Sequence, residues 1–233
     1  MVTLISSFYN EQYLLPWWLK HHKKIFDHGI LFDYFSTDNS VKIIKNICPK
    51  WEVRPTKNTN WDPRTNDSEF MEAERQSKGY KITLTTTEFL VGLFPKLSKF
   101  ETAYEIPIVR MVDTKPEKIP VYDKPLIEQK NVGYLDEGFR KRFLHNHPDG
   151  AYSVGRDRTH HKRYKIPLWV YKYSYSPWTK KLIKRRLQMQ KHMSDEHLAQ
   201  GWGKQHKYDR TGLQKEYEFL LKTANLKTWN FFY

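Results

Sequence analysis

The chain has 233 residues, of which 39% are hydrophobic and 15% aromatic, and its mean hydropathy is −0.79. This length and aromatic content exclude a low-complexity disordered chain and predict one large domain with its own core. The single cysteine, Cys48, excludes an intrachain disulfide and is typical of a reducing compartment. We expect the N-terminal run to be a first strand rather than a secretory leader, and no apolar run approaches roughly 20 residues. We therefore expect a cytoplasmic protein without a transmembrane segment.

The net charge of +14 is concentrated in one segment. Residues 140–191 contain 15 lysines and arginines but only two acidic residues, so this segment carries +13 and the remainder +1. A local positive field of this kind attracts phosphorylated ligands, nucleic acids or anionic lipids.

Short apolar runs alternate with helical patterns over the first 92 residues. We predict strands at 2–10, 30–35, 51–55 and 80–92, and helices at 11–28, 41–47 and 66–79. In the first helix, Pro16 suits the first turn and Gly29 the position after the last turn. Asp38 suits a cap for the second helix. The order βαβαβαβ predicts a three-layer α/β fold with a mainly parallel central sheet.

The second half has a weaker pattern. Residues 94–130 are rich in proline and mix strands with loops, and 131–145 and 150–161 look like further strand and loop pieces. A basic helix is predicted over 176–193 and a closing helix over 212–225. We find neither an internal repeat nor a flexible linker, and therefore predict a single domain over 1–233.

Polar clusters follow three of the four predicted strands. They occupy residues 8–11, 33–40 and 85–88. Carboxyl ends of parallel strands lie at one edge of a sheet, and ligands of open α/β sheets bind outside that edge. We therefore predict a ligand site there.

The first two clusters belong to a longer pattern that spans about 40 residues. Its residues are Asn10, Glu11, Leu15, Trp18, Leu19, His21, His22, Asp33 and the run from Ser36 to Ser40. This pattern resembles the opening of GT-A-fold glycosyltransferases of the family 2 and family 92-like kind. The resemblance implies the GT-A version of the predicted fold and a hexosyltransferase-type enzyme that moves a sugar from a nucleotide-sugar to a glycan or another hydroxyl acceptor. It also implies a nucleotide-binding half, 1–92, and an acceptor-binding half, 93–233.

The same resemblance places an Asp-x-Asp motif at the end of the fourth strand, where the family holds a divalent cation on the donor diphosphate. Here that position reads Thr85-Thr86-Thr87-Glu88. Mn²⁺ and Mg²⁺ prefer carboxylate oxygens, and only Glu88 offers one in this variant motif.

Three interpretations of the variant motif stay open. In the first, Glu88 holds Mn²⁺ or Mg²⁺ together with water and the diphosphate, and His160 or His161 contributes to the metal site. In the second, the metal is dispensable because cationic side chains replace it. The candidate diphosphate-binding residues are Arg140, Arg142, Arg156, Arg158 and Lys162. In the third, the activity has been lost.

The resemblance also assigns nucleotide contacts. Asp33 would accept a hydrogen bond from the base, for which a UDP-sugar is favoured, with GDP- and dTDP-sugars as alternatives. The other nucleotide-binding candidates at the same edge are Phe8, Tyr9, Asn10, Glu11 and Thr86. A structural role is the alternative for the residues after both strands. Asp33 would cap its turn, and Asn10 and Glu11 would cap the first helix.

An inverting transferase needs a carboxylate near the acceptor hydroxyl. Asp136 and Glu137 are our catalytic candidates, whereas the arginines beside Asp157 would depress its pKa and weaken it as a base. We expect inversion, with retention as the alternative. Trp61, in a loop rich in asparagine and proline, is a candidate platform for a sugar ring.

Two other functions compete with the transferase. The basic segment and its interleaved aromatic residues would suit nucleic acid, although no recognition motif accompanies them. The threonine run would suit a non-catalytic member of the same fold that binds a sugar-nucleotide or a glycan.

Overall fold

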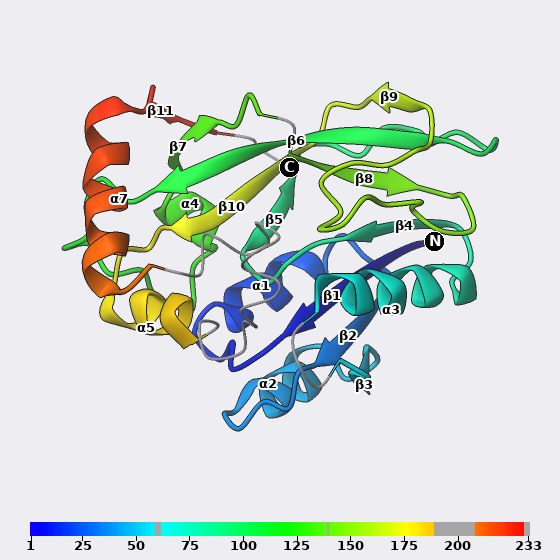
Figure 1. Ribbon diagram of the computed structural model, residues 1–233, viewed down its shortest axis with the longest axis horizontal. Coiled ribbons are helices and arrows are strands. Elements are labelled where there is room, and N and C mark those ends of the chain that lie inside the picture. The colour runs from blue at the N-terminus through cyan, green and yellow to red at the C-terminus, as the bar shows by residue number, and fades with distance from the viewer. Residues whose placement is uncertain (59–61, 139, 189–207, 231–233) are drawn as a thin grey trace.

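The computed structural model describes residues 1–58, 62–138, 140–188 and 208–230. Within these residues one sheet of eleven strands runs through the molecule, and helices lie on both sides of it (Figure 1). Among the described helices, none has both the length and the apolar character needed to cross a bilayer.

The first half forms the predicted parallel sheet. Its strands are β1 (Val2–Phe8), β2 (His28–Asp33), β3 (Glu52–Pro55) and β4 (Tyr80–Thr83), and the helices between them are α1 (Leu15–His22), α2 (Ser40–Ile47) and α3 (Pro63–Gln76). The strands lie in the order β3-β2-β1-β4 and all neighbours in this group are parallel. This is the order found in one half of a doubly wound sheet. The predicted α/β class and the βαβαβαβ order are confirmed.

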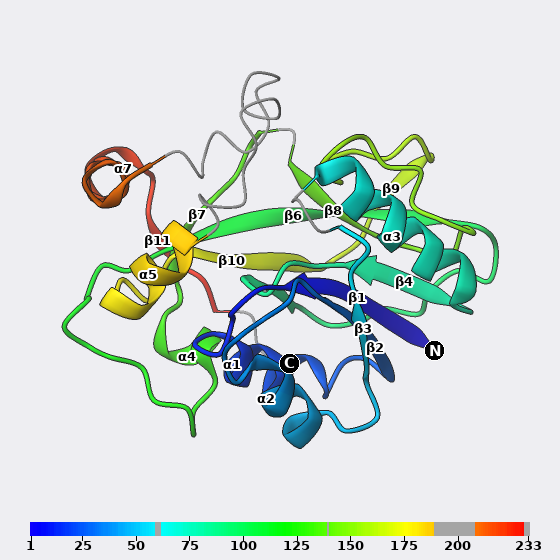
Figure 2. The ribbon, with the colours of Figure 1, turned by 60° about the horizontal axis from the view of Figure 1, so that its bottom comes forward.

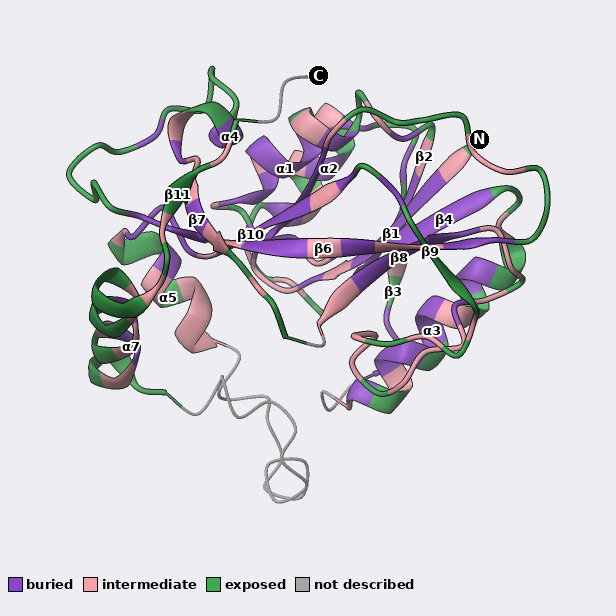
Figure 3. Ribbon diagram, turned by 90° about the horizontal axis from the view of Figure 1, so that it is seen from above, coloured by how far each residue is buried: buried purple, intermediate pink, exposed green. Residues whose placement is uncertain are grey.

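Alternate residues of each strand face two separate cores, as the two-residue period of a strand requires. Leu4 and Leu31 belong to the core that includes residues of α1 and α2, whereas Ile5 belongs to a second core with Phe70 and Ala73 of α3. Figure 3 shows α1 and α2 on one side of the sheet and α3 on the other, with buried strands between them. The first half therefore has the three predicted layers.

The predicted strand 80–92 is wrong in one respect, because it is two strands. β4 ends beside β1, and β5 (Glu88–Val91) pairs instead with β10 (Trp169–Tyr175) in antiparallel fashion. The threonines between the two strands form a connection that Trp18 anchors. Its indole Nε1 donates to the carbonyl oxygens of Thr85 (3.1 Å) and Glu88 (2.8 Å).

One long strand joins the two halves of the sheet. β6 (Ala103–Val112) pairs with β7 (Val132–Leu135), β8 (Lys141–His145), β9 (Arg163–Lys165) and β10, and β8 also pairs with β4. The remaining elements are α4 (Leu126–Gln129), α5 (Lys180–Gln188), α7 (Arg210–Thr223) and β11 (Lys227–Thr228). α5 and α7 match the two predicted late helices, although residues 189–193 of the first lie outside the described residues. Figure 2 shows both helices at the opposite end of the molecule from the N-terminus.

Two neighbouring histidines of α1 are packed against β5. His21 Nε2 donates to the carbonyl oxygen of Leu90 (2.7 Å), and the Leu90 amide donates to His22 Nε2 (3.2 Å). Burial lowers the pKa of His21 to about 4, although the Leu90 carbonyl acts in the opposite direction. Burial, assisted by His21, also lowers the pKa of His22. Both side chains are therefore neutral at pH 7.

We predict that acid destabilises the fold through these histidines. Because the folded pKa of His21 lies below its unfolded value of 6.5, the unfolded chain binds the proton first. Stability is complete above pH 6.5 and falls by on the order of 3 kcal/mol for His21 as the pH drops to 4. Urea unfolding of the wild type and of His21→Gln, which keeps a donor for Leu90, measures the effect. Identical pH slopes in the two proteins would contradict it.

Candidate functional site

The loops after β1 and β2 are fastened to each other at the carboxyl edge of the sheet. Asn10, with a φ of 49°, accepts through Oδ1 from the amides of Thr37 (2.8 Å) and Asp38 (3.2 Å). The Glu11 amide donates to Ser40 Oγ (2.8 Å). Asn10 and Glu11 therefore tie β1 to the next loop. The expectation that they cap α1 is wrong, since its N-cap position is Leu14.

Asp33 and Asp38 organise the loop after β2. Asp33 Oδ1 accepts from the Ser36 amide (2.9 Å), and Asp38 Oδ1 accepts from the Ser40 amide (2.9 Å) at the start of α2. Asp33 therefore caps its turn as predicted. The prediction that Asp38 caps α2 is wrong, because the N-cap position is Asn39 and the helix has no side-chain cap hydrogen bond. The Asp33 side chain remains partly exposed at the sheet edge, so its capping role leaves room for a ligand.

Phe8 and Tyr9 lie at the end of β1 but in different surroundings. Phe8 is only 2% exposed and belongs to the main core. The expectation that Phe8 flanks a nucleotide is therefore corrected, because it would have to leave the core. Tyr9 is partly exposed and lines a cavity.

The basic helix α5 bridges the ends of β1 and β4. Arg185 forms a two-pronged ion pair with Glu11, and its Nη2 lies 3.5 Å from Thr86 Oγ1. Gln188 Nε2 donates to the carbonyl oxygen of Tyr9 (2.8 Å). The basic helix was predicted from the sequence, but Arg185 and Gln188 were not among the predicted site residues. The sequence did contain one signal for them, because residues three apart in a predicted helix lie on the same side of it.

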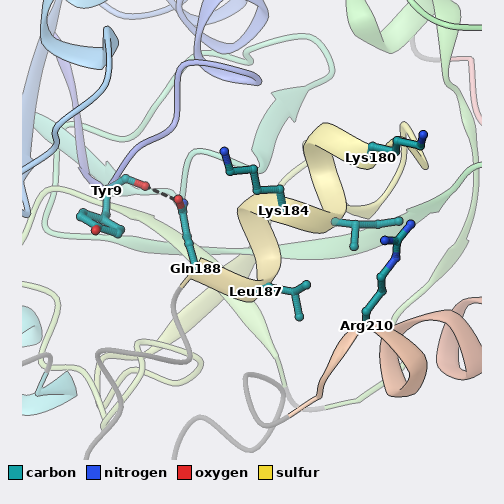
Figure 4. Close-up of a pocket in the computed structure, with 7 residues that line it drawn as sticks. Tyr9, Lys180, Lys184, Leu187, Gln188 and Arg210 are labelled. Atoms are coloured by element: carbon teal, nitrogen blue, oxygen red, sulfur yellow. Dashed lines mark hydrogen bonds between the residues drawn. The ribbon is translucent and has the colours of Figure 1, made fainter.

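A cavity of about 410 Å³ opens along α5 (Figure 4). Its lining residues are Tyr9, Lys180, Ile183, Lys184, Leu187, Gln188 and Arg210. The five residues from α5 have the spacing of a single helix face. Within the described part of the chain, no ion pair joins Lys180, Lys184 or Arg210 to a carboxylate. The cavity therefore has a positive lining.

Glu88 is the centre of a buried ion-pair network. Arg142 donates to both of its oxygens (2.8 and 2.7 Å), Lys172 Nζ donates to Oε1 (2.9 Å), and the Thr85 amide donates to Oε2 (2.9 Å). Burial by itself would raise the pKa of Glu88, but Arg142 and then Lys172 hold it well below its usual range. Glu88 is thus ionised and fully engaged.

Further charges continue the network towards the surface. Arg142 Nη1 donates to Asp157 Oδ1 (2.8 Å), and Arg140 Nε lies 3.6 Å from Asp157 Oδ2. The carboxylates of Glu88 and Asp157 thereby offset two of the predicted phosphate-binding arginines. A phosphate at either arginine would compete with a carboxylate that is already present.

The remaining predicted phosphate-binding residues are dispersed. Arg156 pairs with Asp67 and lies 4.3 Å from the centre of the Phe70 ring. Arg158 is exposed. Lys162, also exposed, lies over Tyr164 next to β9, which pairs with the start of β6. The structure does not gather the five predicted residues into one clamp.

The two predicted metal-binding histidines lie away from Glu88. His161 stacks on His147 with ring centroids 3.8 Å apart, and His160 is exposed. The nearby His145 pairs with Lys81 in the first half of β4, whereas Glu88 follows the end of that strand. The expected combination of Glu88 with His160 or His161 is therefore not formed.

The residues at the variant motif do not fit the divalent cation that the resemblance implies. Thr85, Thr86 and Thr87 are neutral, and a metal at Glu88 would displace Arg142 and Lys172 and leave them without their buried counter-ion. Within the described residues, no group of three or more His, Cys, Asp or Glu side chains is arranged to hold a metal. We assign no chemical step to a metal here.

Asp136 and Glu137 differ in their suitability as a base. Asp136 Oδ2 accepts from Arg110 Nε (2.7 Å), and Oδ1 accepts from the Gly138 amide (3.1 Å). Burial opposes ionisation of Asp136, but Arg110 prevails and lowers its pKa. Asp136 is therefore a weak base, whereas Glu137 is exposed. The candidate sugar platform, Trp61, lies outside the described residues.

No family model and no curated protein sequence matches this chain. Among solved structures it is similar to S. aureus TarS 1–349 in complex with UDP-GlcNAc, at 11% identity and a TM-score of 0.41, over 96% of this chain and 76% of that chain. Against another S. aureus TarS structure it covers only 21% of that chain, at 14% identity and a TM-score of 0.31. It is also similar to glucosyl-3-phosphoglycerate synthase from Mycobacterium tuberculosis, at 8% identity and a TM-score of 0.34, over 63% of this chain and 56% of that chain.

We predict that Glu88 is required mainly for stability. Glu88→Gln leaves Arg142 and Lys172 with a neutral partner in a buried site, which lowers the free energy of unfolding by about 3–5 kcal/mol. The control is Glu52→Gln at an exposed pair with Arg54, where the side chain of Glu52 is 45% exposed and the loss is at most about 1 kcal/mol. Urea unfolding at pH 7 compares the two variants. A Glu88→Gln protein as stable as the wild type would contradict this role.

Proposed function

We propose that the chain is a GT-A-type glycosyltransferase that moves a sugar from a nucleotide-sugar, with a UDP-sugar favoured, to a glycan or another hydroxyl acceptor with inversion. The observation that carries the proposal is that the partly exposed side chains of Tyr9 and Asp33 lie at the carboxyl edge of a doubly wound sheet, near the connection that contains the buried Thr86. Ligands of such sheets bind at this edge, and the pattern of the first 40 residues supports a nucleotide-sugar as the ligand.

Each nucleotide contact has a candidate residue. The partly exposed carboxylate of Asp33 accepts from the base while Oδ1 keeps its hydrogen bond to Ser36. The ring of Tyr9 lies at the end of β1 and packs beside the ribose. Asn10, whose side chain ties two loops together, shapes the site without needing to touch the nucleotide.

Cations of α5 neutralise the diphosphate in this proposal. Lys184 is exposed on the cavity side, and among the described residues it has no carboxylate partner. Arg185 lies beside Thr86, where a phosphate would replace Glu11 as its partner. A guanidinium and an ammonium can stabilise the developing charge of a phosphate leaving group. This places the positive charge in α5 and away from the arginines at 140–158 that the sequence analysis favoured.

For the general base we favour Glu137 over Asp136, because the ion pair with Arg110 makes Asp136 the weaker base. The division at residue 92 into a nucleotide-binding and an acceptor-binding half, and a cytoplasmic location, remain predictions.

We predict that UDP stabilises the protein and that Asp33 mediates this effect. At 100 times its Kd, a ligand that binds only the folded state adds about 2.7 kcal/mol of stability. Asp33→Asn keeps an oxygen for Ser36 but removes the charge, so the UDP-dependent rise in Tm is lost while the Tm without UDP changes little. Asp123→Ala, at an exposed loop position, is the control and keeps the full rise. An equal rise in all three proteins would show that the nucleotide site is elsewhere.

The same Tm measurement with UDP, GDP and dTDP, each in Mn²⁺ or in EDTA, tests which nucleobase is preferred and whether binding needs a metal. We expect the rise with UDP to persist in EDTA, because the variant motif offers no free carboxylate. A rise that appears only with Mn²⁺ would refute the cationic alternative.

A non-catalytic sugar-nucleotide binder is the second candidate, because Glu11, Glu88 and Asp136 are all engaged in ion pairs. Incubation with UDP-sugars separates the two. Slow release of UDP, absent in Asp33→Asn, supports the transferase, whereas binding without release over days supports the binder. A nucleic-acid function would instead show salt-sensitive binding to generic DNA or RNA that exceeds the effect of any nucleotide-sugar.

A further inference from the structure

The cavity along α5 begins at the carboxyl edge and extends away from it. Tyr9 stands at one end of the lining residues and Arg210, the first residue of α7, at the other (Figure 4). Gln188 holds the last turn of α5 against the carbonyl oxygen of Tyr9 at 2.8 Å. A ligand in this cavity would therefore reach from α7 towards the place where the donor sugar is expected.

The cations of the cavity lack an anion of their own. Lys180 and Lys184 are four residues apart on one face of α5, and Arg210 joins them from α7. Like charges at this spacing repel each other, and within the described residues none of the three is paired with a carboxylate. An anionic group in the cavity would relieve this repulsion.

The cavity is not lined by charge alone. Ile183 and Leu187 lie on the same face of α5, between and beyond the two lysines. Small sites with mostly apolar walls and a few convergent polar groups are typical of organic ligands. The occupant suited to this lining has a carbon skeleton as well as an anionic group.

The donor diphosphate is a poorer occupant. Arg185 already supplies a guanidinium at the Glu11–Thr86 edge. Lys180 precedes Arg185 by five residues, which is roughly 7.5 Å along the helix axis, and Arg210 belongs to a different helix. Both cations are therefore available to a second anionic group in the cavity.

We propose that this cavity is the acceptor site and that the acceptor carries a phosphate or carboxylate near the hydroxyl that receives the sugar. Lys180 and Arg210 bind the anionic group, Ile183 and Leu187 contact the carbon skeleton, and the hydroxyl points towards Tyr9. The inference rests on the proposed transferase function, since an acceptor is defined only by a transfer at the neighbouring edge.

Isothermal titration calorimetry with sn-glycerol 3-phosphate, glycerate and glycerol tests the proposal, and UDP is titrated separately. Glycerol 3-phosphate is a small molecule with free hydroxyls beside a phosphate, and glycerol is its neutral counterpart. We expect an anion to bind and glycerol not to bind. Lys180→Ala and Arg210→Ala each raise the Kd of the anion by roughly tenfold, because each removes one charge-assisted contact. Both variants change the Kd of UDP by less than about twofold, which corresponds to a change in binding free energy below roughly 0.4 kcal/mol.

Two further variants serve as controls. Arg210→Lys keeps the charge and recovers most of the affinity, and Lys45→Ala, at an exposed position of α2, leaves all affinities unchanged. Unfolding curves of each variant confirm that the protein remains folded. Comparison of the Kd of glycerol 3-phosphate with that of glycerate identifies whether the cavity prefers a phosphate or a carboxylate.

The outcomes separate this proposal from the proposed function. Absence of UDP binding together with anion binding that depends on Arg210 would refute the nucleotide site and leave an anion site. If Lys180→Ala and Arg210→Ala weaken the binding of UDP and leave the binding of the anion unchanged, the cavity holds the donor and the proposal is overturned. It is also overturned if neither anion binds, or if a random oligonucleotide binds more tightly than both and loses affinity in the same variants.

Discussion

The contacts of the Glu88 carboxylate with Arg142 and Lys172 support the rest of the site. The three side chains come from β5, β8 and β10, so the network joins a strand that leaves the parallel sheet to two strands of the second half. An isolated charge in such a place would be expensive to bury, and only the complete set compensates for the lost hydration. The network therefore fixes the end of the connection 84–87 and gives Glu88 a structural role that its neighbouring threonines could not fill.

The first half of the fold could be predicted because its signals are local. Pro16 lies in the first turn of α1, and apolar runs alternate with helical patterns over short distances. The predicted helix end at Gly29 is wrong, because α1 ends at His22 and Gly29 lies within β2. The break in 80–92 could not be predicted in this way, because threonine suits a strand and a connection equally well. The break depends on β10, whose Lys172 is separated from Glu88 by 84 residues. Strand pairing between residues so far apart in the sequence cannot be predicted from a local pattern.

The pairing of the charged residues could not be predicted from the sequence. Counting charges located the positive segment, yet the partners of its arginines are carboxylates that come from elsewhere in the chain, such as Asp67 and Glu88. These pairs cancel much of the field between residues 140 and 157. Among the described residues, Lys180 and Lys184 of α5 have no carboxylate partner, and the cavity that they line also includes Arg210 of α7. Net charge per segment therefore indicates attraction for anions without showing which side chains are available to them.

The bond from Trp18 to the connection after β4 has a consequence for binding. A loop that orders only when a ligand arrives subtracts the loss of its conformational entropy from the affinity. Here the indole holds the carbonyl oxygens of Thr85 and Glu88 from a fully buried position in α1, so the connection is already ordered before a ligand arrives. Thr86 is thus preorganised, and a ligand at this edge would be expected to associate without waiting for the loop to rearrange.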